Sequence, residues 1–106
     1  MINKKILGLL GLATRAGKTI FGTESVTQAI QKKQVRLVIV AKDAAERTKK
    51  NIEKLCQENQ IEQRVWASNS ELSQAIGQVN KAIIGIKDQN FSNEIIKLID
   101  GGDIIG

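Results

Sequence analysis

The segment that most restricts the fold of this chain is residues 36–41, Arg-Leu-Val-Ile-Val-Ala, in which Leu37 to Ala41 are all apolar. A strand with one face in water alternates apolar and polar residues, whereas an uninterrupted β-branched run is typical of a strand covered on both faces. Residues 82–86, Ala-Ile-Ile-Gly-Ile, have the same character. The chain must therefore supply helices for both faces of a sheet.

Helical and strand patterns alternate along the chain, because apolar residues recur at helical spacing between the apolar runs. In the first half of the chain we expect a helix whose apolar stripe runs from Ile2 to Ala13 and which Gly17 closes, a strand over 19–21, a helix from Gly22 or Thr23 to Lys32–Lys33, and the strand 36–41. A helix containing Ile52, Leu55 and Cys56 and a strand over 63–67 follow. The last expected elements are a helix ending at Gly77, the strand 82–86, and a helix containing Phe91 and Ile99 that Gly101-Gly102 stops.

This order predicts an α/β fold, a three-layer α/β/α sandwich with helices on both faces of a mixed, mostly parallel sheet of about four strands. Nothing in the sequence marks a domain boundary, since there is no proline and no Ser/Gly-rich linker. We therefore expect one domain over residues 1–106, with a loose tail at 101–106.

Two segments have the spacing of a helix N-terminal cap. Ser68-Asn-Ser-Glu71 has the capping-box pattern, in which the serine and the glutamate three residues later each bind the other's backbone N–H. Asp43-Ala-Ala-Glu46 is close to the same pattern, so Asp43 is a candidate cap for the third helix.

The charge of the chain favours a polyanionic partner. It has 106 residues, with 16 Lys and Arg against 11 Asp and Glu and a formal net charge of +5. Neutralising phosphates releases counterions, so a basic excess in a small domain raises the expectation of nucleic-acid binding. Only three aromatic residues are present, which disfavours binding by base stacking and favours structured RNA recognised by shape and phosphate.

No catalytic, metal or cofactor site is indicated. Histidine is absent, which removes the commonest general base and the commonest metal ligand. Cys56 is alone and is expected in the core, as in proteins of a reducing cytoplasm. No segment reaches the ~20 apolar residues that a membrane-spanning helix needs. We expect a cytoplasmic, monomeric protein that is not an enzyme and has no membrane partner.

Residues 11–19, Gly-Leu-Ala-Thr-Arg-Ala-Gly-Lys-Thr, resemble a phosphate-binding P-loop but miss its spacing. Five residues separate the two glycines, where the loop needs four to wrap phosphates with successive backbone N–H groups. The segment also follows a helical stripe rather than a strand. A nucleotide-binding enzyme is thus a rival interpretation that this spacing does not favour.

Several segments together resemble the kink-turn-binding ribosomal protein superfamily, often called L-seven-Ae-like. The resemblance covers residues 12–99, and the opening Leu-Gly-Leu-Ala-Thr-Arg-Ala-Gly-Lys18 is similar to its bacterial YlxQ-type branch. The segments that carry it are Gly22 to Ile30, Val35 to Asp43, Asn51 to Ile61 and Ser68 to Gly77. The resemblance implies a three-layer α/β/α sandwich that binds RNA kink-turns, which are sharply bent internal loops with tandem sheared G·A pairs.

The family's main contact stretch is Gly-x-Asn-Glu-x-x-Lys at the start of the second helix. Here Gly22 matches the glycine, but Glu24, Ser25 and Gln28 stand where Asn, Glu and Lys are usual. An amide both donates and accepts, whereas the ionised Glu24 only accepts, and Gln28 removes a cation. The resemblance therefore implies weaker kink-turn binding or a preference for a variant RNA.

The second family contact is the loop over residues 75–80, where apolar residues pack on the bulged nucleotide. Ile76 and Val79 are the candidates, although ordinary core packing explains Ile76 better and Val79 equally well. The predicted contacts have three roles. Thr23, Glu24, Ser25 and Gln28 read base edges and sugar beside Gly22; Arg15, Lys18, Lys32, Lys33 and Lys42 contact phosphates; Ile76, Gly77, Gln78, Val79 and Asn80 cap the extruded nucleotide.

The implied partner is a structured RNA, ribosomal or regulatory. The rival from another class is a protein–protein adaptor of the translation or transcription machinery, with a reduced RNA surface. The departures at Glu24, Ser25 and Gln28 favour the adaptor, and the basic residues around them favour RNA.

Overall fold

The computed structural model describes residues 3–101, and it confirms every expected helix and strand within that range. The elements are α1 (Lys4–Arg15), β1 (Thr19–Phe21), α2 (Thr23–Gln31), β2 (Leu37–Val40), α3 (Glu46–Glu58), β3 (Glu62–Val65), α4 (Asn69–Ala75), β4 (Ile83–Ile86) and α5 (Gln89–Gly101). The strands at 37–40, 62–65 and 83–86 differ from their expected bounds by one or two residues.

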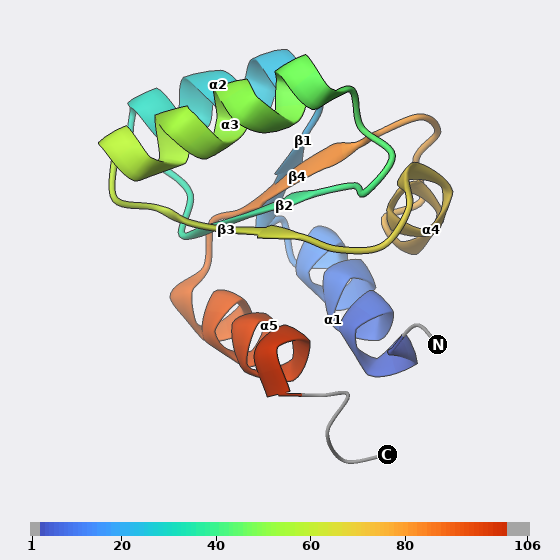
Figure 1. Cartoon of the computed structure of the whole chain (residues 1–106). Helices are drawn as coiled ribbons and strands as arrows, with labels where there is room; N and C mark the ends of the chain where they lie inside the picture. The colour runs from blue at the N-terminus through green and yellow to red at the C-terminus, as the bar shows by residue number, and fades with distance from the viewer. Residues whose placement is uncertain (1–2, 102–106) are drawn as a thin grey trace.

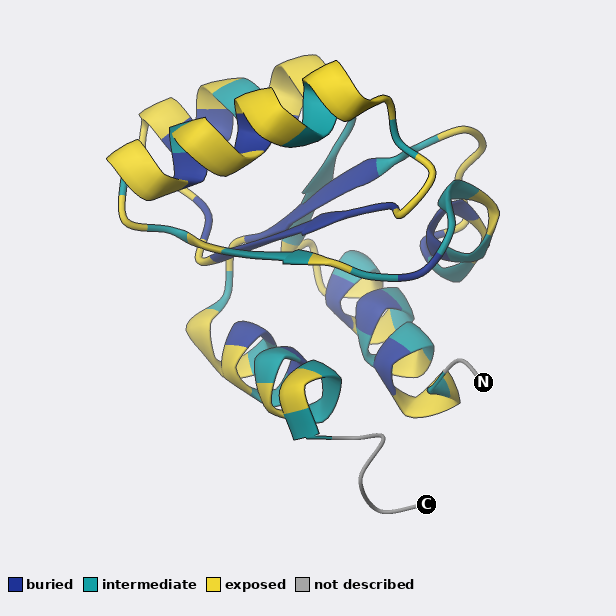
Figure 2. Cartoon of the chain, viewed as in Figure 1, coloured by how far each residue is buried: buried dark blue, intermediate teal, exposed yellow. Residues whose placement is uncertain are grey.

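The sandwich has three layers, as predicted. Helices α2 and α3 cover one face of the sheet, and α1 and α5 cover the other, with α4 beside one end (Figure 1). Alternate residues of β2 enter two separate cores. Val38 and Val40 pack with α2 and α3, while Leu37 and Ile39 pack with α1, α4 and α5. All four are fully buried, as expected for a strand covered on both faces (Figure 2).

The sheet is mixed, but the expectation that it is mostly parallel is wrong. Its strand order is β1-β4-β2-β3, and of the three neighbouring pairs only β2–β3 is parallel, while β1–β4 and β4–β2 are antiparallel. Strand β4 lies between β1 and β2 and runs against both. The short helix α4 returns the chain to the end of the sheet at which β3 leaves it (Figure 1), so β4 enters from that end and is antiparallel.

This topology collects loops at one end of the sheet. Phe21 pairs with Ile84, and Val40 pairs with both Ile83 and Val65. The last residues of β1, β2 and β3 therefore lie level with the first residues of β4. We call this end of the sheet the loop edge; it holds the segments at 22–25, 41–43 and 76–82. We call the opposite end the basic edge; it holds Lys18, Lys32, Lys33, Arg36 and Lys87.

Helices α1 to α4 end in the same way. The N–H of Lys18 reaches the carbonyl of Ala13 at 2.8 Å, and Gly17 has φ +72°, which confirms Gly17 as the left-handed residue that closes α1. Equivalent closures follow α2, α3 and α4, with left-handed residues at Lys33, Gln60 and Gly77.

The two expected caps have different outcomes. Ser68 and Glu71 form the capping box, with reciprocal hydrogen bonds of 3.1 and 2.9 Å. The expectation for Asp43 is wrong, because α3 begins after Ala45 and has no side-chain cap. Asp43 Oδ1 instead accepts from the backbone N–H of Asn69 at 2.8 Å.

Further expectations concern Cys56 and the ends of the chain. Cys56 is buried in the α2–α3 core, as predicted, and burial raises the pKa of its thiol to about 11. Trp66 packs at the rim of the other core. Gly101 is the last residue of α5 rather than its stop. Ile2, the first residue of the expected apolar stripe, and residues 102–106 of the expected tail lie outside the described residues.

Candidate nucleic-acid interface

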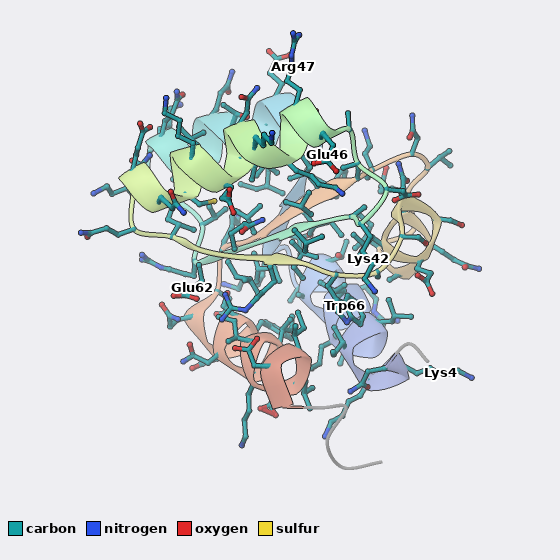
Figure 3. The ribbon with its side chains drawn as sticks, viewed as in Figure 1. Lys4, Lys42, Glu46, Arg47, Glu62 and Trp66 are labelled. Atoms are coloured by element: carbon teal, nitrogen blue, oxygen red, sulfur yellow. The ribbon has the colours of Figure 1, made fainter. Side chains whose placement is uncertain are left out.

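The loop edge is held together by backbone hydrogen bonds between its segments. Gly22 N–H donates to the carbonyl of Ile83 at 3.0 Å, and Lys42 N–H donates to that of Ala67 at 2.7 Å. Lys42 and Trp66 both lie at this end of the sheet, and Glu62 lies at the other (Figure 3). The start of α2, the end of β2 and the loop before β4 thus form one surface.

The start of α2 is open to solvent. Gly22 has φ +98° and ψ 144°, and no side chain caps the helix. A Cβ at Gly22 would meet nothing within 4 Å, so the glycine is required by its backbone conformation rather than by crowding. Thr23, Glu24 and Ser25 follow and are exposed. Backbone donors at a helix start with no capping side chain suit an anionic or carbonyl acceptor.

The loop between α4 and β4 presents an apolar side chain to solvent. Val79 is 85% exposed, whereas Ile76 is only 5% exposed and belongs to the α1–α4–α5 core. The buried position removes Ile76 from the predicted nucleotide cap, because its side chain is already packed. Gly77, Gln78 and Asn80 are exposed in the same loop.

A polar network fixes this loop, and sequence analysis missed it. Asn69 Nδ2 donates to Oδ1 of Asn80 at 2.9 Å, and Ser73 Oγ donates to Asn69 Oδ1 at 2.9 Å. Ser73 Oγ also accepts from the N–H of Lys81 at 2.7 Å, and Asp43 anchors Asn69 from the β2 side. Apart from Asn69 and Ser73, which are four positions apart on α4, the partners are 8 to 26 positions apart, a spacing that leaves no periodic pattern for sequence reasoning to detect.

A shallow hollow of about 650 Å³ opens over this network. Asp43, Asn69, Ser73, Val79 and Asn80 are among the residues that line it. The hollow has polar walls and the exposed Val79 at its border. Such a surface can hold one flat group against an apolar side chain while amides and a hydroxyl meet its edges.

In addition to Lys42, the cations Arg15 and Lys81 lie at the loop edge. Arg15 and Gly77 line a second hollow of about 430 Å³ between α1 and α4. Lys81 was missed by sequence analysis; its Nζ lies 5.9 Å from the centroid of the Phe21 ring, a cation–π distance. Arg15, Lys42 and Lys81 are therefore positive charges at the loop edge.

The structure does not bring the other predicted phosphate contacts to this edge. Lys18 precedes β1, and its carbonyl accepts from the N–H of Lys87, which follows β4. Lys32 and Lys33 follow the far end of α2. These three lysines lie at the opposite end of the sheet, so the expectation that they join one interface with Gly22 is wrong. Gln28 is exposed on α2 between the two ends.

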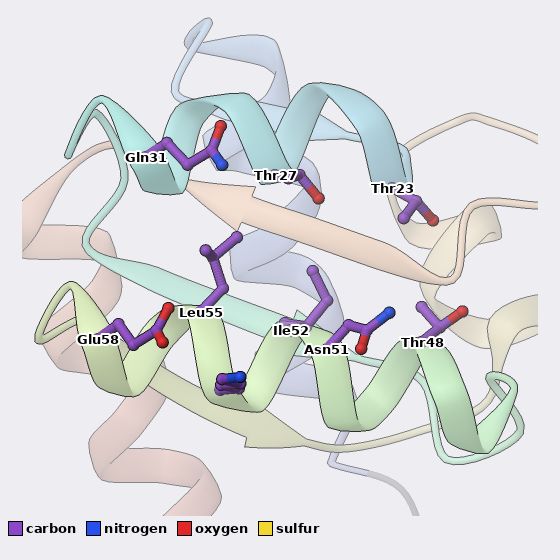
Figure 4. A pocket seen from close by; sticks show the side chains of 9 residues that line it. Thr23, Thr27, Gln31, Thr48, Asn51, Ile52, Leu55 and Glu58 are labelled. Carbon is purple, nitrogen blue, oxygen red and sulfur yellow. The ribbon is translucent and has the colours of Figure 1, made fainter.

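A groove of about 370 Å³ runs between α2 and α3, which lie in parallel (Figure 4). Thr23 and Thr48 lie at one end, and Gln31 and Glu58 at the other. Of the predicted contact residues, Thr23 lines this groove, which therefore begins at the loop edge.

The glycine-rich segment 11–19 has the wrong surroundings for a P-loop. Gly11 lies inside α1, and Thr19 begins β1. The order is helix–turn–strand, whereas a P-loop needs strand–loop–helix. Over residues 3–101, no cluster of three or more Cys, Asp or Glu could bind a metal ion, and no helix has the length and apolarity to cross a bilayer.

The sequence of this chain is similar to a known protein family and to individual proteins over most of its length. Residues 4–96 match the family of ribosomal proteins L7Ae, L30e, S12e and Gadd45. The RNA-binding protein YlxQ of Bacillus subtilis strain 168 is 32% identical over 92 residues, which cover 87% of this chain and 92% of that protein. The protein of the same name from Enterococcus faecium is 36% identical over 98 residues, covering 92% and 94%.

A solved structure described as a protein with unknown function from Bacillus halodurans C is 42% identical. It superposes with a TM-score of 0.89 and covers 92% of this chain and 99% of its own. The family match spans most of the chain, and the relatives are matched over nearly their full lengths. The chain belongs to the L7Ae/L30e/S12e/Gadd45 ribosomal protein family.

Proposed function

We propose that this protein binds structured RNA through the loop edge, and that its target is a kink-turn or a related internal loop of a ribosomal or regulatory RNA. Family membership and two relatives named as RNA-binding proteins support the proposal. The observation that carries it is the pairing of the open α2 start at Gly22 with the 85% exposed Val79 on the same edge.

In this mechanism the protein is a rigid scaffold with two contact segments. Gly22 lets the RNA backbone approach closely, and Thr23, Glu24 and Ser25 meet base edges and sugar. Val79 covers the extruded nucleotide above the hollow. Lys42 and Arg15 contact phosphates, and these contacts orient the RNA without reading sequence.

Glu24 determines which RNA such a surface accepts. Its ionised carboxylate accepts from guanine N–H groups but repels phosphates. We therefore expect specificity to rest on the bent shape and the extruded nucleotide more than on tight groove contacts.

The direct test is titration of the protein with a kink-turn RNA and with a mutant RNA that lacks the sheared G·A pairs, at two salt concentrations. Preference for the intact kink-turn supports the proposal. Equal, salt-sensitive binding to both RNAs indicates a merely basic surface. Absence of binding to either RNA contradicts it.

The second candidate is a protein–protein adaptor, which the exposed carboxylate of Glu24 at the family's contact position favours. Charge reversal at Lys42 separates the two functions. RNA affinity should collapse in Lys42→Glu, whereas adaptor binding through the same edge need not change.

A further inference from the structure

The basic edge, opposite the loop edge, gathers five exposed cations from three segments of the chain. They are Lys18 before β1, Lys32 and Lys33 after α2, Arg36 before β2, and Lys87 after β4. The antiparallel position of β4 places its end beside the starts of β1 and β2. Segments separated by up to about seventy residues thus present like charges on one surface.

Backbone hydrogen bonds hold these segments in place. The N–H of Lys87 donates to the carbonyl of Lys18 at 2.8 Å, and the N–H of Arg36 donates to that of Ile86 at 2.7 Å. Lys33 adopts φ +56°, and the next residue, Gln34, closes α2 with a bond of 2.8 Å to Ala29. Like charges are therefore concentrated on a fixed scaffold rather than spread along a flexible tail.

The five cations are not neutralised within the part of the chain that the structure describes. The ion pairs there join Glu46 to Lys49, and Glu62 and Asp100 to Arg64. Two carboxylates lie at the same end of the sheet: Glu62, which is paired with Arg64 at 2.9 Å, and Asp88, whose Oδ2 accepts from the N–H of Phe91 at 2.8 Å. The five cations outnumber them. The positive charge of the edge is thus available to an external anion.

The composition of the edge favours phosphates over a protein partner. Protein interfaces usually bury an apolar centre. Over residues 3–101, the large apolar side chains that are exposed are Leu12, Val65 and Val79, and none of them belongs to the basic edge. An array of cations without an apolar anchor matches the regular charge of a nucleic-acid backbone, which is bound mainly through phosphate contacts.

We propose that the basic edge is a second RNA-contact surface, which binds the phosphate backbone of an RNA duplex without sequence preference. It goes beyond the function proposed for the loop edge and does not require it. The nine residues of α2 separate the two edges, a helical rise of about 13 Å. An RNA held at the loop edge would reach the basic edge through a flanking helix or a second RNA segment, which makes the protein bivalent.

The test compares two full-length variants that remove the same charge. The edge variant is Lys18→Gln, Lys32→Gln, Arg36→Gln and Lys87→Gln; Lys33 is kept because of its positive φ. The control variant is Lys4→Gln, Lys5→Gln, Lys50→Gln and Lys97→Gln, at exposed positions on α1, α3 and α5. Circular dichroism and thermal unfolding establish that both variants fold.

The probe is a plain RNA duplex without an internal loop, titrated across a salt series. We expect the edge variant to reduce the slope of log affinity against log salt by about 2 to 4, at ~0.9 for each phosphate that the protein no longer neutralises. The control variant should change the slope by less than about 1.

Equal slopes for the edge and control variants would overturn the proposal. It is also wrong if poly-L-glutamate binds the wild type more tightly than the duplex and loses more affinity in the edge variant, because the partner is then an acidic protein. Neither result depends on a kink-turn, so failure here leaves the function proposed for the loop edge untouched.

Discussion

Asn69, the first residue of α4, donates a 2.9 Å hydrogen bond to Asn80 in the loop that follows the same helix. Asn80 has φ +55°, a backbone conformation that side-chain hydrogen bonding helps an asparagine to hold. The bond closes the loop back onto its own helix and places the neighbouring Val79 at the border of the hollow. The order of this loop therefore depends on a residue of α4 that lies outside the loop itself.

Replacing Asn69 should weaken RNA binding more than folding. In Asn69→Ala the hydrogen bond no longer holds the loop in place before binding, so the RNA has to order the loop as it binds. Loss of the bond costs about 1 kcal/mol, or roughly fivefold in affinity. Thermal unfolding and RNA titration, measured side by side, separate the two effects. Asn90→Ala, at an exposed position on α5, should change neither. An unchanged RNA affinity in Asn69→Ala would show that the loop is ordered without this bond.

Val79 and Ile76, three residues apart, should respond in opposite ways. Val79→Ser removes an exposed apolar contact, so we expect lower kink-turn affinity with the unfolding temperature nearly unchanged. Ile76→Ala opens a cavity in the α1–α4–α5 core, and we expect a loss of roughly 2–5 kcal/mol in the free energy of unfolding. Denaturant titration with and without RNA measures both. A kink-turn affinity that survives in Val79→Ser would remove Val79 from the interface.

Glu24→Asn should strengthen kink-turn binding. The amide donates as well as accepts, and the change removes a negative charge close to RNA phosphates. A well-placed bidentate contact is worth ~1–3 kcal/mol, so we expect affinity to rise at least about fivefold. Glu53→Gln on α3 removes the same charge from another surface and serves as the control. An equal gain in both variants would mean that only net charge matters.

Local patterns determined how far the sequence alone could predict this structure. The β-branched run in β2, the Ser68–Glu71 capping box and the left-handed Gly17 are each encoded within a few residues, and each was predicted correctly. Strand direction depends on how α4 returns the chain, which no local pattern records, so the sheet was expected to be mostly parallel.

The candidate interface was predicted only in part for the same reason. Family resemblance pointed to Gly22 and the loop at Val79, which the structure brings to one edge. Charge along the sequence does not reveal which end of the sheet a lysine occupies, so Lys18 and Lys42 were assigned together although they lie at opposite ends. Asn69 and Ser73 act through contacts made only in the folded chain.

Two glycines with open space around them should respond oppositely to alanine. A Cβ at Gly8 or at Gly22 would meet nothing within 4 Å. Gly8 lies within α1, so Gly8→Ala should stabilise the protein by about 0.5–1 kcal/mol, because alanine loses less backbone freedom on folding. Gly22 has φ +98°, so Gly22→Ala should destabilise it by roughly 1–3 kcal/mol. Denaturant unfolding of the two variants provides the comparison, and a neutral Gly22→Ala would contradict the strained backbone there.

The pair between Arg64 and Asp100 should make stability depend on pH in the acid range. Arg64 Nε and Nη2 donate to Oδ1 and Oδ2 of Asp100 at 2.9 Å each, which joins β3 to α5. The hydrogen bonds from Arg64 hold the pKa of the Asp100 carboxyl below its usual value. A carboxyl whose pKa is lower in the folded state stabilises the protein above the unfolded pKa, about 3.9, and loses that contribution as the pH falls through the folded pKa.

The unfolding temperature of the wild type should therefore fall below about pH 4 more steeply than that of Asp100→Asn, which cannot ionise. At neutral pH the variant should be slightly less stable, because exposed pairs contribute little and salt screens them. Glu94→Gln, on the same helix, tests whether any carboxyl on α5 has this effect. Parallel pH profiles for the wild type and Asp100→Asn would mean that the pair forms without a measurable gain, since two ordered side chains can lose in entropy what the bidentate contact provides.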